Sequence, residues 1–126
     1  MSRRIFISAG PVTMEAELND STTASMVWDA LPLTGQANTW GDEIYFRIPV
    51  DMDEGPDARE EVEVGELGYW PTGSAFCIFF GPTPASTGGE PRAASPVNPL
   101  GHVLGEPDAF KAVLPGATVM LERGED

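Results

Sequence analysis

The sequence predicts a mainly β fold, because three of its features are typical of short strands joined by turns. The chain of 126 residues contains 14 glycines and 12 prolines, which interrupt it often. Apolar and polar residues alternate in residues 12–18, as they do in a strand with one buried face. The longest apolar run, residues 75–80, is short and lies between glycine- and proline-containing segments, as a buried strand does. We therefore expect a single antiparallel β domain that spans residues 1–126.

The first two strands are expected to form a hairpin. Residues 3–8 have the composition of one strand and residues 12–18 that of the next, and Gly10 and Pro11 supply the turn between them. A helix of about three turns should follow. Four apolar residues occur there at helical spacing, at positions 24, 27, 28 and 31.

The ends of this helix are marked by capping and breaking residues. Its start can be capped by Asp20, Ser21 or Thr22, whose side-chain oxygens accept hydrogen bonds from backbone N–H groups of the first turn. Pro32 ends it, because a proline cannot continue a helix.

The middle of the chain predicts further strands. Residues 43–48 alternate again, with Ile44, Phe46 and Ile48 on one face. Residues 51–61 are an acidic loop, and residues 62–64 form a short strand. The run at residues 75–80 is expected to be a strand buried on both faces, with Ala75, Cys77 and Phe79 on one face and Phe76, Ile78 and Phe80 on the other.

The last third of the chain predicts a long loop and a compact end. Residues 81–99 contain five prolines and three glycines and offer little to bury, so we expect a long loop that is either a functional lid or a mobile excursion, and in the binding hypothesis it is the lid. Beyond it we expect a short strand at 102–104, a short helix from Pro107 and a last strand at 117–123.

The charge excludes several kinds of partner. The net charge of −13 comes from 20 acidic and 7 basic residues, which repels nucleic acids and anionic membrane surfaces. The single cysteine and short apolar runs favour a cytoplasmic location, with no membrane segment. With one His and one Cys, we expect no metal site, and no phosphate-binding motif predicts a cofactor.

The candidate ligand-binding residues are mostly aromatic. Trp40, Tyr69 and Trp70, like Tyr45, lie close to glycines and prolines, which is typical of a half-exposed rim around a small ligand or peptide and equally of satellite core packing under loops. Cys77 is expected to be a small buried apolar residue, and His102, the only histidine, is a candidate contact although a lone histidine is more often structural. Asp42 and Glu43 are adjacent, so they should point to opposite faces and not share a proton.

Several segments resemble cyclophilins. Residues 73–78, Gly-Ser-Ala-Phe-Cys-Ile, resemble the cyclophilin run Gly-Ser-Gln-Phe-Phe-Ile, and His-Val-Leu-Gly at 102–105 resembles a later motif. Residues 40–46, 68–71 and 76–84 are similar to a family of small bacterial and archaeal cyclophilin-like proteins without assigned function. The resemblance implies a closed antiparallel barrel of about eight strands with two short capping helices.

The resemblance to the isomerase site is incomplete. In cyclophilins an arginine donates toward the prolyl nitrogen, and a phenylalanine lines the proline pocket. Arg47 would be the donor, but aligning on Pro49 places Phe46 at the arginine position. The pocket phenylalanine falls on Cys77, and residues 51–55 are acidic and contain no glutamine.

These features lead to three functional hypotheses. The first is a non-catalytic module that binds a small molecule or a proline-containing peptide in an outer groove, with Trp40, Arg47, Tyr69, Trp70, Cys77 and His102 as contacts. Arg47 would bind a ligand anion. The second is a weak or specialised peptidyl-prolyl isomerase that uses Arg47. The third is a structural or protein-interaction role in an oligomer.

Overall fold

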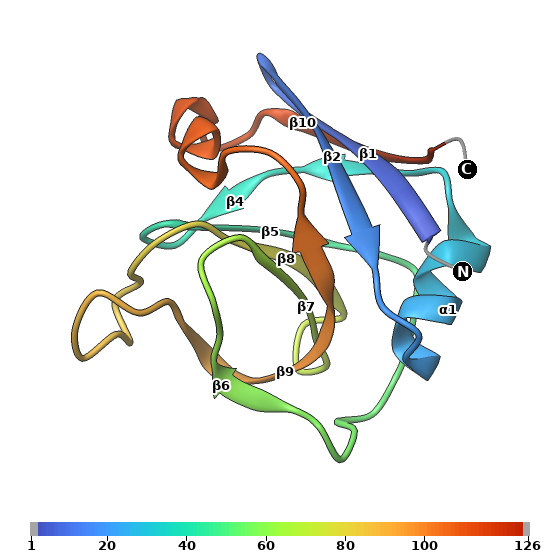
Figure 1. Ribbon diagram of the computed structural model, residues 1–126, viewed down its shortest axis with the longest axis horizontal. Coiled ribbons are helices and arrows are strands. Elements are labelled where there is room, and N and C mark those ends of the chain that lie inside the picture. Colours follow the sequence, from blue (N-terminus) through green and yellow to red (C-terminus); the bar gives the residue numbers. More distant parts are fainter. Residues whose placement is uncertain (1–2, 125–126) are drawn as a thin grey trace.

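The computed structural model of the protein describes residues 3–124 and confirms the mainly β class (Figure 1). Strands hold 46% of these residues and helices 12%. The elements are β1 Arg3–Ala9, β2 Val12–Leu18, α1 Thr22–Ala30, β3 Leu33–Gln36, β4 Asn38–Thr39, β5 Glu43–Arg47, β6 Arg59–Glu61, β7 Glu66–Trp70, β8 Ala75–Phe79, β9 Arg92–Val103, the 3₁₀ helix η1 Pro107–Ala112 and β10 Thr118–Arg123. Within the described range, no helix is long and apolar enough to cross a membrane.

The predicted hairpin and helix are both confirmed. β1 and β2 pair antiparallel around a turn in which Gly10 adopts a φ of +55°, a conformation that favours glycine. Ser21 caps α1, because its hydroxyl accepts a hydrogen bond from the backbone N–H of Ala24. The helix ends before Pro32, as expected.

The sheet curls until its two ends approach each other, but hydrogen bonds do not join them. The strand order is β3-β10-β1-β2-β9-β7-β8-β5-β4, with β6 pairing β9 outside this path. Gly35 of β3 packs so closely on β5 that a Cβ there would lie 2.6 Å from the Phe46 ring. Because no ladder pairs β3 with β4 or β5 in residues 3–124, the prediction of a closed barrel is not confirmed.

The chain itself links the two ends of the sheet. Ala37 lies between β3 and β4, and its backbone exchanges hydrogen bonds with Gly116 and Ala117 before β10. The next two residues, Asn38 and Thr39, pair instead with β5. The strand therefore changes partners at Ala37.

In the middle of the chain one prediction is wrong and one strand was not predicted. The short strand predicted at 62–64 ends earlier, as β6 at Glu61. The segment before residues 75–80 is strand β7, which pairs with β8 and β9. Gly68 hides this strand from periodicity, because it interrupts the pattern where β7 packs against Val97 of β9.

The predicted loop over residues 81–99 is wrong in its second half. Only residues 81–91 form a loop, at the left of Figure 1, and β9 begins at Arg92. Pro99 fits in this strand because it faces Gly68 beside a shift in register, where a missing N–H is tolerated.

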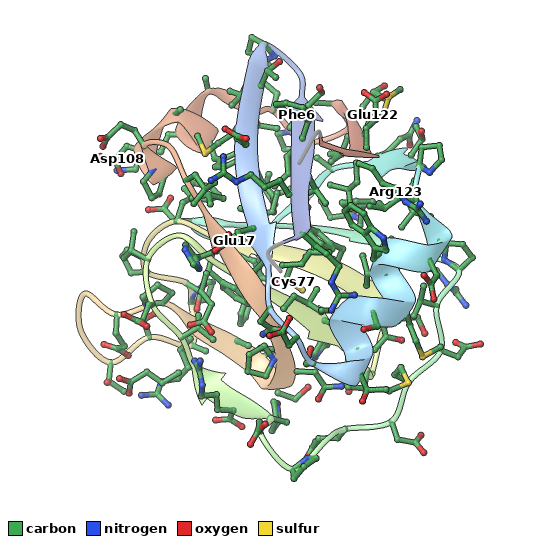
Figure 2. All side chains as sticks on the ribbon, turned by 45° about the vertical axis from the view of Figure 1, so that its right-hand side comes forward. Phe6, Glu17, Cys77, Asp108, Glu122 and Arg123 are labelled. Carbon is green, nitrogen blue, oxygen red and sulfur yellow. The ribbon has the colours of Figure 1, made fainter. Side chains whose placement is uncertain are left out.

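The core has two parts, separated by β8. Phe76, Ile78 and Phe80 join the large cluster enclosed by the curled sheet. Ala75, Cys77 and Phe79 face a smaller cluster on the other side. The prediction that this strand is buried on both faces is therefore confirmed, and Figure 2 shows Cys77 in the interior of the molecule.

Arg123 of β10, which is labelled in Figure 2, contacts Trp28 and holds helix α1 against the strand. The Arg123 guanidinium lies 4.8 Å from the centre of the Trp28 ring, a cation–π contact. The same side chain donates two hydrogen bonds to the Trp28 carbonyl, at 3.1 and 3.3 Å.

Candidate functional site

A small aromatic pocket lies beside the smaller cluster. It has a volume of about 190 Å³ and is lined by Trp40, Glu43, Tyr45, Trp70, Ala93 and Ala94. Tyr45 and Trp70 pack on the smaller cluster, which places the pocket on the face of β8 that points away from the main core. The pocket is smaller than the roughly 300–1,000 Å³ of typical drug-sized sites, so its size suits a small headgroup.

The Trp70 side chain is held in place by Ser95 and by Gly73. Its indole N–H donates a hydrogen bond of 2.6 Å to the Ser95 hydroxyl. Gly73, in the turn after β7, packs so tightly against the indole that a Cβ there would lie 2.7 Å from the ring. The Tyr45 ring lies 6.1 Å from the Trp70 ring at an interplanar angle of 71°, an edge-to-face pair.

Trp40 is positioned by a tight turn at the start of β5. Its backbone N–H donates to the Glu43 carbonyl, and Gly41 between them has a φ of +60°. A Cβ on Gly41 would lie 2.8 Å from the backbone of Thr83, so the loop at 81–91 packs directly on this turn.

This loop is ordered by its own hydrogen bonds. The Thr83 hydroxyl donates to the Arg92 carbonyl, and the Ser86 hydroxyl donates to the Glu90 carbonyl. Backbone and hydroxyl donors of Thr87 lower the pKa of Glu90 to about 2, with help from Arg92. The segment predicted to be a lid is therefore internally hydrogen-bonded, and none of residues 81–91 lines the pocket.

Glu43 is a buried carboxyl that contributes to the pocket lining. Its side chain is only 6% exposed, and it lies on the same face of β5 as Tyr45. Burial raises the pKa of Glu43 to about 7, although a hydrogen bond with the Cys77 thiol acts in the opposite direction. No ion pair involving Glu43 is present among residues 3–124.

Cys77 lies behind Glu43 and is fully buried. Burial raises the pKa of the Cys77 thiol well above its usual value, and the Glu43 carboxylate raises it further. A thiol held protonated in this way is a poor nucleophile, so the structure gives Cys77 no role in covalent chemistry at the pocket.

The structure separates the six predicted ligand-binding residues. Trp40 and Trp70 are half-buried and line the same pocket, but Cys77 lies beneath it. The prediction that Tyr69 lies on a rim is wrong: its ring is fully buried in the main core, and its hydroxyl donates to the Val50 carbonyl. Tyr69 points to the opposite face of β7 from its neighbour Trp70, because successive strand residues alternate faces.

Arg47 and His102 lie outside the pocket. Arg47 is exposed at the end of β5, opposite Ala75 of β8 and on the same face as Tyr45. His102 lines a separate groove of about 500 Å³, which also contains Arg59 and Glu66. The prediction that His102 shares a groove with the aromatic residues is therefore wrong.

Four pocket residues were not among the six predicted contacts: Glu43, Tyr45, Ala93 and Ala94. The alternation in residues 43–48 places Glu43 and Tyr45 on the nominally polar face of the strand. β5 pairs with β8, the strand that was expected to be buried on both faces. In this pairing Glu43 lies opposite Phe79, and Tyr45 lies opposite Cys77. Combining the two patterns would have predicted a buried carboxyl at Glu43.

Comparisons with known proteins agree with this architecture. The cyclophilin-like family model matches residues 3–122. The solution structure of a hypothetical protein from Archaeoglobus fulgidus is similar, with a TM-score of 0.82 and 36% sequence identity, over 98% of this chain and 95% of that chain. A search of curated proteins finds no match. The chain belongs to the cyclophilin-like family, in the group of small relatives whose function is not assigned.

Proposed function

We propose that the protein is a non-catalytic binding module and that its site is the pocket between Trp40, Glu43, Tyr45 and Trp70. One observation carries this proposal: Glu43, a residue that is only 6% exposed, lines an aromatic cavity without an ion-pair partner among the described residues. Burying an unpaired carboxylate costs free energy, so such a group is a candidate for a functional role.

The second buried glutamate provides an internal comparison. Glu66 is 8% exposed, close to the value for Glu43, but Arg59 donates hydrogen bonds to both of its carboxylate oxygens. The backbone N–H of Glu63 donates to it as well. Glu66 is thus a satisfied structural carboxylate, whereas the groups that surround Glu43 leave room for a ligand.

The rigidity of the pocket also supports binding. Trp70 is held by Ser95 and Gly73, and Trp40 by the turn at Gly41. A site whose side chains are already in place loses little conformational entropy when a ligand enters.

A thermal-shift screen of small molecules and short peptides tests the proposal. A ligand at about 100 times its Kd stabilises by about 2.7 kcal/mol, which raises the Tm of a chain of this size by on the order of 10 °C. We expect Trp70→Ala to abolish the shift and His102→Ala, in the separate groove, to retain it. A shift that survives Trp70→Ala would place the ligand elsewhere.

A peptidyl-prolyl isomerase is the second candidate, favoured by the exposed Arg47 on the same strand face as Tyr45 and Glu43. The buried Cys77 stands against it, because a proline ring cannot reach the position where cyclophilins have the pocket phenylalanine. Acceleration of Ala-Pro isomerisation that Arg47→Ala removes would favour this candidate over the binding module.

A further inference from the structure

We infer that the ligand of the pocket is a small organic cation, an alkylated ammonium group held between the three aromatic rings and the Glu43 carboxylate. The inference rests on the proposed function and adds the chemical class of the ligand. Its first support is the composition of the lining, which joins two indoles and a phenol to one acidic group and contains no lysine or arginine.

The arrangement of the rings favours a cation. The faces of aromatic rings carry partial negative charge and attract ammonium groups, most strongly for tryptophan. Tyr45 and Trp70 stand nearly at right angles, at 71°, so their surfaces bound a corner of the pocket. The indole N–H of Trp70 is already bonded to Ser95, which leaves the ring itself as the surface that a ligand can contact.

The buried carboxyl gives the second support. Glu43 has no ion pair within residues 3–124, and the Cys77 thiol is a weak donor. A bound ammonium group would provide the positive charge that Arg59 provides for Glu66 elsewhere in the protein. An anionic ligand would instead bring a second negative charge next to the Glu43 carboxylate, which is electrostatically unfavourable.

The other lining residues and the net charge of the chain also favour an alkylated cation as the ligand. Ala93 and Ala94 offer only apolar side chains, which suits the methyl groups of an alkylated ammonium better than a heavily hydrated ion. The net charge of −13 draws cations toward the protein and repels anions.

Isothermal titration calorimetry with three matched probes tests the inference. The probes are choline, its neutral analogue in which a carbon atom replaces the nitrogen, and a carboxylate of the same branched shape. Near pH 8, where Glu43 is mostly ionised, we expect choline to bind at least about tenfold more tightly than the neutral analogue. The carboxylate should not bind.

Two charge-removing variants complete the experiment. Glu43→Gln should weaken choline binding at least about tenfold and change binding of the neutral analogue by less than about twofold. Glu122→Gln removes one charge from an exposed position on β10 and should leave the affinities for both probes within about twofold of wild type. A peptide that carries a trimethylated lysine is titrated in parallel. If it binds more tightly than choline, the natural ligand is a methylated lysine side chain and not a free small molecule.

The possible failures are distinguishable. Equal affinity for choline and the neutral analogue would overturn the cationic ligand, while loss of both in Trp70→Ala would leave the pocket as the binding site. Equal loss of choline binding in Glu43→Gln and Glu122→Gln would reduce the preference to general attraction by the acidic protein and would also overturn the inference. If no probe binds, the cation is excluded, and the thermal-shift screen alone decides the proposed function.

Discussion

Glu43 is a buried acidic residue without an ion-pair partner in residues 3–124. Burial holds its pKa near 7, compared with an ordinary value of 4.5, so the folded protein retains this proton to higher pH than the unfolded chain does. The nearest titratable side chains on its face are Tyr45 on the same strand and Cys77 on β8, and β9 contributes two alanines. Arg47 lies further along β5 and points to solvent.

The pH dependence of stability should therefore report on Glu43. Its contribution is most favourable below about pH 4.5 and is lost as the pH rises through about 7, by on the order of 3 kcal/mol. We expect Glu43→Gln to be more stable than wild type near pH 8, with the difference shrinking toward pH 4. Urea denaturation of both proteins at the two pH values measures this, and the other acidic residues cancel in the comparison. A difference independent of pH would contradict it.

At the residue scale, the sequence predicted the pocket in part. Trp40 and Trp70 were expected at a ligand site because they flank turns, and both line the pocket. Tyr69 was expected there for the same reason and is buried, because proximity to glycine and proline does not determine which face of a strand a side chain occupies. That information comes only from the pairing of β7 with its neighbours.

At the scale of elements, strands whose apolar and polar residues alternate were identified from the sequence, whereas β7 and most of β9, which lack this alternation, were not. Residues 12–18 and 43–47 alternate and were predicted almost to their ends. β7 is buried on both faces and contains Gly68, so no alternation is visible. β9 contains two of the prolines that made residues 92–99 resemble a loop.

The loop at 81–91 depends on one buried hydroxyl. Thr83 is 7% exposed, and its hydroxyl donates to the Arg92 carbonyl and accepts from the Ala85 N–H. Thr83→Val keeps the shape and removes both bonds, so we expect a loss of about 1–3 kcal/mol in the free energy of unfolding. Thr87→Val, at an exposed position of the same loop, is the control and should cost less. If both variants lose the same free energy of unfolding in urea denaturation, the buried Thr83 hydroxyl has no special role in stabilising the loop.

At the scale of the whole molecule, side-chain packing between β3 and β5 keeps the sheet curled where no hydrogen-bonded ladder joins its two ends. The resemblance to cyclophilins correctly implied antiparallel strands around one main core, whereas closure by a complete ladder is not confirmed. Which strands end a sheet is decided by contacts between distant residues, such as Gly35 and Phe46, and local sequence patterns do not encode it.

The contact between Gly35 and Phe46 can be tested directly. The Cβ of Gly35→Ala would lie 2.6 Å from the Phe46 ring, so either the ring or β3 must move. We expect a loss of about 1–3 kcal/mol, measured by chemical denaturation, as for other overpacked sites. Gly89→Ala, where a Cβ would meet nothing within 4 Å, is the control and should change stability little. An equal effect of both variants would exclude a special role for this joint.

The placement of the three tryptophans has a practical consequence. Trp40 and Trp70 lie on the pocket, whereas Trp28 lies under Arg123 on α1, outside it. The indole emission spectrum therefore combines two reporters of occupancy with one that monitors the helix. Replacing Trp28 by phenylalanine would leave an optical signal that arises only from the pocket, so that occupancy could be followed in stopped-flow mixing without any attached dye.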